Sequence, residues 1–515
     1  MTYDIVILGG GLAGNLLARQ IRRTLPSLSV GLVEPTERAS RKVGESTVEI
    51  ASDYLVRRHD LSAYLYDRQL PKNGLRFFFD DPERNTSLLD MSELGSDHIP
   101  LFPTFQVDRA RLEDDLRQMN VELGVDMRIG ERVRDVHLER GTKNHRVDVR
   151  GPGGEATLEA RWVIDCTGRH RELSRKMELA TPVDHGLNAV WARYEGVQDL
   201  DTISDASWRG RVRYTSRVLS TNHFCYPGYW IWLIPLGNGV TSVGLVGEKD
   251  KFRRGIRTAE GFKAFLDEHR AVRELMADAT LMDIGGYQQL AYGSRKFFGK
   301  DRWAVIGDAA AFVDPFYSPG SDFIAVENDL VTDLIRRDIE GDEKEPFDSV
   351  VETYDAFMKM RFDATLLLYQ QQYKTLGSYE ILHQKWNYDL CTYYNLWLDD
   401  YMRDRHLEPR HVRTHLRRRG YIMQALRNFR DLFATMADEL MTQGHYHRSN
   451  LGRYNPGTDL QGFWRDVGSD RRRREINAVT ADIFNHVRRE SLELLGQREG
   501  GEVPLHEFME ERPLA

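Results

Sequence analysis

The first 34 residues constrain the fold of this chain most. The segment YDIVILGGGLAGNLLARQIRR reads as a strand, a turn and a helix, with Gly9, Gly11 and Gly14 in a G-x-G-x-x-G pattern. The first glycine lets the chain turn, the second lets backbone approach a pyrophosphate, and the third lets helix and strand pack closely. A second strand, LSVGLVE, ends in Glu34, 20 residues after Gly14, where a carboxylate can meet a ribose hydroxyl. These residues therefore predict a βαβ unit that binds a dinucleotide.

Bulk composition describes an ordered globular protein and excludes several function classes. The 515 residues are 29% charged and 10% aromatic, which leaves room for more than one domain. The net charge of −8 gives no general attraction to nucleic acid or to anionic membranes. The three cysteines are widely separated, and no apolar run reaches membrane-spanning length. We expect a cytoplasmic protein with no nucleic-acid partner, no membrane partner and no bound metal.

Three later segments identify the dinucleotide. RWVIDCTG (161–168) reads as a strand that ends in a turn, and RWAVIGDAAAFVDP (302–315) is a strand that delivers Asp308 to a helix start. FQVDRARLEDDLRQM (105–119) reads as a strand end and a helix, with Arg109 near the helix start. Together they resemble the para-hydroxybenzoate-hydroxylase-like flavoproteins, an α/β fold with a Rossmann-type FAD-binding domain. The resemblance implies FAD, with Asp308 near its ribityl and pyrophosphate groups.

The pattern along the chain predicts three parts. Residues 1–185 and 280–340 would form a discontinuous FAD-binding domain. Residues 186–279 alternate in the period of strands and would form an antiparallel sheet over the flavin. The strands expected there are NAVWARYEG (188–196), RVRYTSRVL (211–219), YWIWLIP (229–235) and TSVGLVG (241–247). Residues 341–515 have helical periodicity and would form a substrate cap.

Three further motifs narrow the family. RKVGESTVEI (41–50) follows the second strand, and LPKNGLRFFFDD (70–81) places Lys72 just before an aromatic strand. WIWLIP (230–235) is a buried strand whose two indoles each need a hydrogen-bond partner, and it matches W-x-W-x-I-P. In this order the motifs resemble the flavin-dependent halogenases of the tryptophan-halogenase type, over roughly residues 1–340. The chain has no second G-x-G-x-x-G, so a separate flavin reductase would supply the electrons.

The resemblance implies a two-component reaction with Lys72 at its centre. Reduced FAD (FADH2), O2 and chloride or bromide give hypohalous acid, which passes to a second compartment. There Lys72 hydrogen-bonds the acid or becomes a haloamine, and an electron-rich arene is substituted. An ammonium suits this role because it has three donors and because burial lowers its pKa. Trp230, Trp232 and Pro235 would wall this compartment off from the flavin.

The same resemblance predicts the cofactor contacts. They are Gly9, Gly10, Gly11, Leu12, Ala13, Gly14, Glu34, Arg41, Val43, Gly44, Ser46, Arg109, Asp308 and Ser321.

The segment DPFYSPG (314–320) departs from the tryptophan-type pattern D-P-L-E-S-T-G. Tyr317 replaces the glutamate that faces lysine and substrate, and we expect it to line the compartment of Lys72. Pro319 replaces a threonine and has no N–H, so one halide donor is lost. Gly320 and Ser321 remain as halide donors. The missing glutamate argues against free tryptophan and favours a phenolic or pyrrolic substrate, free or carried by an acyl carrier protein.

Two other functions stay open, as do several features of the C-terminal third. The P-x-G sequence also occurs in aromatic monooxygenases of this fold, and a non-catalytic flavin-binding partner protein would need no halide site. The helix expected over 387–402 is aromatic and would pack in the core or line the cap. Arginine runs at 416–421 and 470–475 read as solvated faces, or as a docking patch for a carrier protein. The chain would be a monomer or a homodimer.

Overall fold

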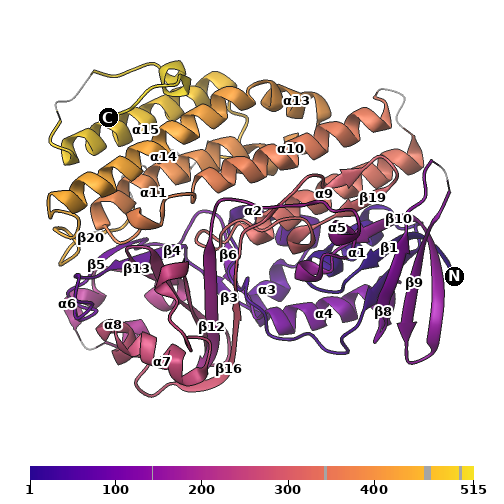
Figure 1. The fold of residues 1–515 in the computed structure, drawn as a ribbon, viewed down its shortest axis with the longest axis horizontal. Coiled ribbons are helices and arrows are strands. Elements are labelled where there is room, and N and C mark those ends of the chain that lie inside the picture. The colour runs from indigo at the N-terminus through magenta and orange to yellow at the C-terminus, as the bar shows by residue number, and fades with distance from the viewer. Residues whose placement is uncertain (142, 204, 342–344, 458–465, 498–500) are drawn as a thin grey trace.

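A twisted, mainly parallel sheet forms the first layer, with the predicted βαβ unit at its centre (Figure 1). The computed structural model describes residues 1–141, 143–203, 205–341, 345–457, 466–497 and 501–515. The strand order is β18-β19-β10-β1-β2-β7, with β9 paired to β10 and β8 to β9. The bounds are β1 Thr2–Leu8, β2 Val30–Glu34, β7 Asp126–Ile129, β8 Arg132–His137, β9 His145–Gly151, β10 Gly154–Asp165, β18 Phe298–Gly299 and β19 Trp303–Val305.

The carboxyl ends of three parallel strands meet at one edge of this sheet. Leu8 of β1 lies opposite Val33 of β2 and Asp165 of β10. Helix α1 (Leu12–Thr24) starts directly after the glycine turn and packs against α4 (Arg109–Glu122). In open α/β sheets, ligands bind in the crevice outside such strand ends.

A second sheet of eight strands lies beside the first layer. Its order is β16-β12-β15-β14-β13-β4-β5-β20. The bounds are β4 Leu75–Phe79, β5 Ser92–Gly95, β12 Leu187–Glu195, β13 Thr221–Tyr226, β14 Tyr229–Pro235, β15 Val240–Glu248, β16 Thr280–Tyr287 and β20 Tyr454–Asn455. Residues 186–279 thus contribute only β12 to β15, and the rest come from other parts of the chain. The sheet is also mixed, because the pairs β4–β13 and β5–β20 are parallel.

The strand predicted over 211–219 is wrong. The segment is irregular and ends in a 3₁₀ turn, Arg217–Leu219. The alternation was misleading because Tyr214 points into solvent while Arg217 is fully buried. The Arg217 guanidinium lies 3.5 Å from the centre of the Trp208 ring and forms an ion pair of 2.8 Å with Glu93.

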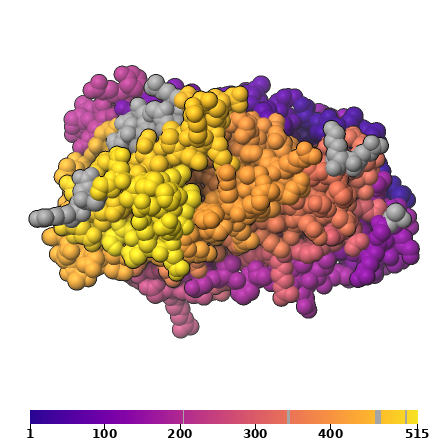
Figure 2. All heavy atoms as spheres, turned by 90° about the horizontal axis from the view of Figure 1, so that it is seen from above, coloured from indigo at the N-terminus to yellow at the C-terminus, as the bar shows by residue number. Residues whose placement is uncertain are grey.

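Helices from residues 341–515 cover both sheets on one side (Figures 1 and 2). Helix α9 (Gly320–Glu340) leads into them. They are α10 Phe347–Leu367, α11 Tyr379–Tyr393, α12 Asp399–Met402, α13 Pro409–Arg417, α14 Arg419–Thr442 and α15 Arg473–Leu494, with a π-helical turn, Tyr394–Leu398, between α11 and α12. Among the described residues, no helix is both long enough and apolar enough to cross a membrane.

Shorter elements connect the layers. They are α2 Glu49–Asp53, α3 Ser62–Arg68, β3 Leu70–Lys72, β6 Thr104–Gln106, α5 Glu172–Lys176, β11 Ala180–Thr181, α6 Ala206–Arg209, α7 Ala259–Asp267, α8 Arg270–Leu275 and β17 Gly293–Ser294.

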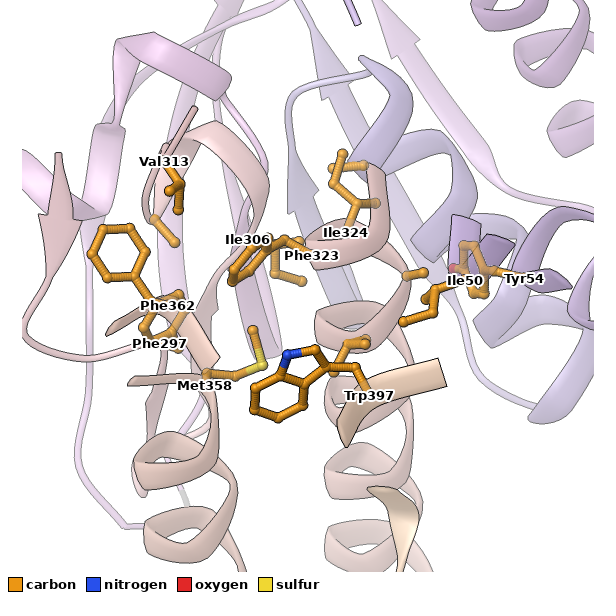
Figure 3. Packing of buried hydrophobic residues seen from close by; sticks show 14 of the residues in the cluster. Ile50, Tyr54, Phe297, Ile306, Val313, Phe323, Ile324, Met358, Phe362 and Trp397 are labelled. Atoms are coloured by element: carbon orange, nitrogen blue, oxygen red, sulfur yellow. The ribbon is translucent and has the colours of Figure 1, made fainter. Parts of the chain in front are cut away.

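One hydrophobic core joins the first layer to the cap (Figure 3). Phe323 and Ile324 at the start of α9 belong to the same cluster as Met358 of α10 and Trp397 of the π-helical turn. The Arg361 guanidinium lies over the rings of both Phe323 and Trp397, at 5.6 and 5.0 Å. The cap therefore packs directly on the helix that follows the predicted flavin site.

Candidate functional site

A large cavity opens at the carboxyl ends of β1, β2 and β10. Its volume is about 960 Å³, and it is lined by the glycine turn, by residues 40–46 and by the start of α9. Basic side chains also line it: Arg41, Lys42, Arg109, Arg132, Arg134 and Arg169. A helix N-terminus and several cations together favour an anionic ligand such as a dinucleotide pyrophosphate.

The predicted cofactor residues line this first cavity, with Gly10 and Gly14 as exceptions. The Gly10 N–H donates to Glu34 Oε2 at 2.7 Å, and a Cβ on Gly14 would lie 2.0 Å from the Gly9 carbonyl oxygen. These two glycines shape the turn instead of facing the cavity. Glu34 also accepts a hydrogen bond from the Thr36 N–H at 2.9 Å, so both its oxygens help to hold the turn.

Arg109 and Asp308 both line the first cavity, although they lie far apart in the sequence. The Arg109 guanidinium donates to the Val43 carbonyl at 3.1 Å, which ties residues 41–46 to α4. Gly44 has a φ of +90°, and a Cβ there would lie 2.7 Å from Arg109. Asp308 lies 3.9 Å from Arg169, and burial raises the pKa of Asp308 against the pull of that arginine.

Lys72 ends β3 and is 2% exposed. Its Nζ donates to Ser46 Oγ at 2.8 Å and to the Thr47 carbonyl at 2.7 Å. Burial lowers the pKa of Lys72 to about 8, although Glu49 and Asp322 act to raise it. Two of its three N–H groups are therefore engaged, and the structure records no third partner among the described residues.

A second cavity, of about 190 Å³, is lined by Lys72 and Tyr317 together. The two predicted catalytic residues thus face one compartment. Ser46 connects this compartment to the first cavity, because it lines the first and accepts the hydrogen bond of Lys72. Ser46 was predicted to contact the cofactor, and its bond to Lys72 was not foreseen.

The first turn of α9 lies between the two cavities. Pro319 and Phe323 line both, while Gly320 and Ser321 line the first. The N–H groups of a helix's first turn have no partner within the helix. Ser321 Oγ is buried and also has no partner among the described residues.

Trp230 and Trp232 lie on β14 and line the first cavity. Each indole N–H finds its partner: Tyr373 Oη at 3.1 Å for Trp230, and Ser242 Oγ at 3.2 Å for Trp232. Gly244 makes room for Trp232, because a Cβ there would lie 2.2 Å from the indole. Pro235 ends the strand and lines neither cavity.

Two further aromatic residues lie between the tryptophans and the second cavity. Phe316 packs on Trp230 with ring centres 5.2 Å apart, and Phe77 packs on Phe316 at 5.5 Å. Phe77 lines the second cavity. Trp230, Phe316 and Phe77 thus form a row of rings from the first cavity to the second, and the sequence analysis missed Phe77 because it lies outside W-x-W-x-I-P.

The cap contributes one wall of the second cavity. The sequence motifs had left this role of the cap open. The aromatic stretch 387–402 lines it, as one of the two readings of that stretch expected. Tyr393 Oη donates to Asp322 at 2.8 Å and Tyr394 Oη donates to Glu49 at 2.6 Å. Burial raises the pKa of Asp322 to about 7. Asp389 accepts a hydrogen bond from Tyr317 at 2.7 Å and is paired with Lys385.

The arginine run 470–475 is partly structural. Arg471 is 9% exposed and pairs with the buried Asp399 at 2.7 Å, so that run is not a purely solvated face. A group of possible metal ligands, Asp400, His411 and His415, is also present. Asp400 accepts hydrogen bonds from both histidines, at 2.9 and 2.7 Å. These bonds are enough to explain why the three side chains lie together.

Comparisons with known proteins agree with this architecture. The profile of a family described as "Tryptophan halogenase" matches residues 4–75 and 84–375. The chain is 28% identical over 439 residues to the flavin-dependent halogenase chlA of Dictyostelium discoideum, covering 79% of this chain and 72% of that relative. It is 27% identical to a 1H-pyrrole-2-carbonyl-(peptidyl-carrier protein) brominase of Pseudoalteromonas luteoviolacea, covering 67% and 80%. Matches to three further curated relatives span between 60% and 64% of their lengths.

The likeness in fold to solved structures extends over the cap. The crystal structure of halogenase PltM in complex with phloroglucinol and FAD is 16% identical, with a TM-score of 0.66, and the match covers 93% of this chain and 96% of that one. The predicted para-hydroxybenzoate-hydroxylase-like α/β fold is confirmed.

Proposed function

Because this chain belongs to the tryptophan halogenase family of flavin-dependent oxidoreductases, we propose that it halogenates an electron-rich, phenolic or pyrrolic arene, free or carrier-bound. The observation that carries the proposal is the position of Lys72. Its ammonium lines the second cavity, and its acceptor Ser46 lines the first. An oxidised halogen species formed in the first cavity and a substrate held in the second would meet at this lysine.

The first cavity fits FAD in shape and charge. Gly11 leaves the space beside the turn open, since a Cβ there would meet only Lys42 Nζ, at 3.9 Å. The N-terminus of α1 and Arg109 would hold the pyrophosphate, with Asp308 near the ribityl chain. Bound in its reduced form, FAD supplies the oxidation of halide by O2 to hypohalous acid. We expect a separate reductase to provide FADH2, because the chain has only one G-x-G-x-x-G.

The first turn of α9 is the proposed halide site. Gly320 and Ser321 would donate N–H groups to chloride or bromide. Pro319 caps the helix and offers no N–H, so the Ser321 hydroxyl would supply a further donor.

We expect Ser321→Ala to raise the KM for bromide about fivefold, the effect of one hydrogen bond worth about 1 kcal/mol. Because Ser321 Oγ has no partner in the described structure, its removal should leave the melting temperature unchanged. Bromide titration of product formation tests this, and an unchanged KM would remove Ser321 Oγ from the halide site.

The protonation state of Lys72 separates two modes of action. With its pKa near 8, the side chain is an ammonium below that pH and a neutral amine above it. We propose that the ammonium donates a hydrogen bond to hypohalous acid, so the single-turnover rate should be level below pH 8 and fall above it. A rate that rises through pH 8 would identify the neutral amine, and hence a haloamine, as the active form.

Product mass spectrometry tests the function itself. The purified protein would receive FAD, a flavin reductase, NADH, O2 and bromide, over a panel of phenols, pyrroles and indoles. We expect a bromine isotope doublet in a product. An added oxygen atom without bromine would assign the monooxygenase function instead, and tight FAD binding with no product across free and carrier-bound arenes would assign the non-catalytic one.

A further inference from the structure

Helix α11 and the π-helical turn form a largely aromatic wall of the second cavity, and among their described residues Asp389 is the one charged group that lines it. Helix α11 and the π-helical turn line this wall with Trp386, Asp389, Leu390, Tyr393 and Trp397, which share one helical face. Tyr317, which precedes α9, lies against this wall, with its ring centre 5.9 Å from that of Trp386. A flat apolar ligand would be enclosed by these rings.

Asp389 is held in place from two directions. Its Oδ2 accepts a hydrogen bond from Tyr317 Oη at 2.7 Å and from Lys385 Nζ at 2.7 Å. Lys385 also donates to the Leu368 carbonyl at 2.7 Å, and the two charged side chains are 3% and 4% exposed. The carboxylate is therefore charge-paired and cannot rotate away without breaking both bonds.

The second carboxylate oxygen of Asp389 is the unexplained feature. Oδ1 is buried and has no hydrogen-bond partner among the described residues. A buried acceptor without a donor costs about 1–3 kcal/mol, and more when it is charged. Asp322, on the same cavity, differs in this respect, because its two oxygens accept from the Ala51 N–H and from Tyr393 Oη.

We propose that Asp389 accepts a hydrogen bond from the hydroxyl group or ring N–H of a single-ring aromatic substrate. This inference rests on the proposed function and names the group that recognises the substrate. The ring size follows from the volume of about 190 Å³, since an engineered apolar cavity of about 150 Å³ binds benzene. A carboxylate at the hydroxyl or nitrogen also stabilises the positive charge that develops on the ring during electrophilic attack.

Binding of a matched ligand pair tests the proposal without turnover. 3-Methoxyphenol and 1,3-dimethoxybenzene differ in one donor, because the second carries a methyl group in place of the hydroxyl hydrogen. Their dissociation constants would be measured by calorimetry on the full-length, FAD-loaded protein. We expect the wild type to bind the phenol at least about tenfold more tightly than the ether, and Asp389→Asn to reduce this preference to about threefold or less.

Three further variants serve as controls for the role of Asp389. Asp399→Asn removes a buried carboxylate of the cap that pairs with Arg471 away from the cavity, and it should keep the preference. Glu49→Gln tests another carboxylate on the cavity wall, and loss of the preference there but not in Asp389→Asn overturns the proposal. If Asp389→Asn does not fold, Lys385→Met/Asp389→Asn removes the unpaired cation as well and carries the same measurement.

The outcomes for this inference and for the proposed function are separate. A wild type that shows no preference for the phenol, or that binds neither ligand, overturns the role of Asp389 whatever the products are. A preference that depends on Asp389 in a protein that never incorporates bromide supports the binding role and refutes halogenation.

Discussion

Replacing Lys72 with alanine is expected to reduce bromination by about a thousandfold or more, the loss typical when a preorganised charged donor is removed. Among the residues that the structure describes, the ammonium is the one polar group that lines the second cavity and also bonds to Ser46, which lines the first. Product formation in single turnovers with reduced FAD measures the loss. FAD affinity should stay within about threefold of the wild type, because Lys72 does not line the first cavity.

Lys72→Met separates the charge from the packing. Methionine keeps most of the unbranched stem and fills the buried space, but it donates no hydrogen bond to the Ser46 hydroxyl or to the Thr47 carbonyl. We expect it to be as inactive as Lys72→Ala and more stable to heat. Retained bromination in Lys72→Met would show that the lysine acts only by filling space.

Gly14→Ala is expected to weaken FAD binding by about tenfold to a hundredfold, because overpacking of about 1–3 kcal/mol must be relieved by moving backbone. The added Cβ would lie 2.0 Å from the Gly9 carbonyl oxygen, which is part of the pyrophosphate turn and cannot rotate away. Fluorescence titration with FAD measures the change, and the melting temperature should fall as well.

The matched control is Gly153→Ala. Gly153 lies in the turn between β9 and β10, and a Cβ there would meet nothing within 4 Å. It tests the general effect of replacing glycine with alanine, and both FAD affinity and melting temperature should be unchanged. Equal FAD affinity in Gly14→Ala and Gly153→Ala would contradict the packing role of Gly14.

Short-range motifs predicted the first layer and the position of Lys72. The glycine turn and Glu34 lie within 25 residues of Gly10, and their spacing is set by the backbone geometry of one βαβ unit. Strand-like apolar sequence likewise predicted β14, and every residue of YWIWLIP is buried. The pattern of strand residues was misleading over 211–219, where the burial of Arg217 depends on Glu93, 124 residues away.

The residues around the second cavity could not be predicted from the sequence, because they are joined by contacts between residues far apart in the chain. Tyr317 and Asp389 are 72 residues apart, and Tyr394 and Glu49 are 345 apart. Nothing in the sequence near Asp389 distinguishes it from Asp399 or Asp400, which serve ion pairs elsewhere in the cap. The helix period placed an aromatic face on the cap, but only the assembled fold selects which carboxylate reaches the cavity.

Strand β20 limits how this protein can exchange parts with its relatives. Tyr454 and Asn455 come from the C-terminal third and pair in parallel with β5, at the edge of the second sheet. A bridge between Met91 and Leu451 adjoins this pair. The cap is thus joined to the second sheet by backbone hydrogen bonds and is not a hinged lid. A chimera that borrows another substrate specificity must bring its own edge strand, or leave the backbone of β5 open to pairing between molecules.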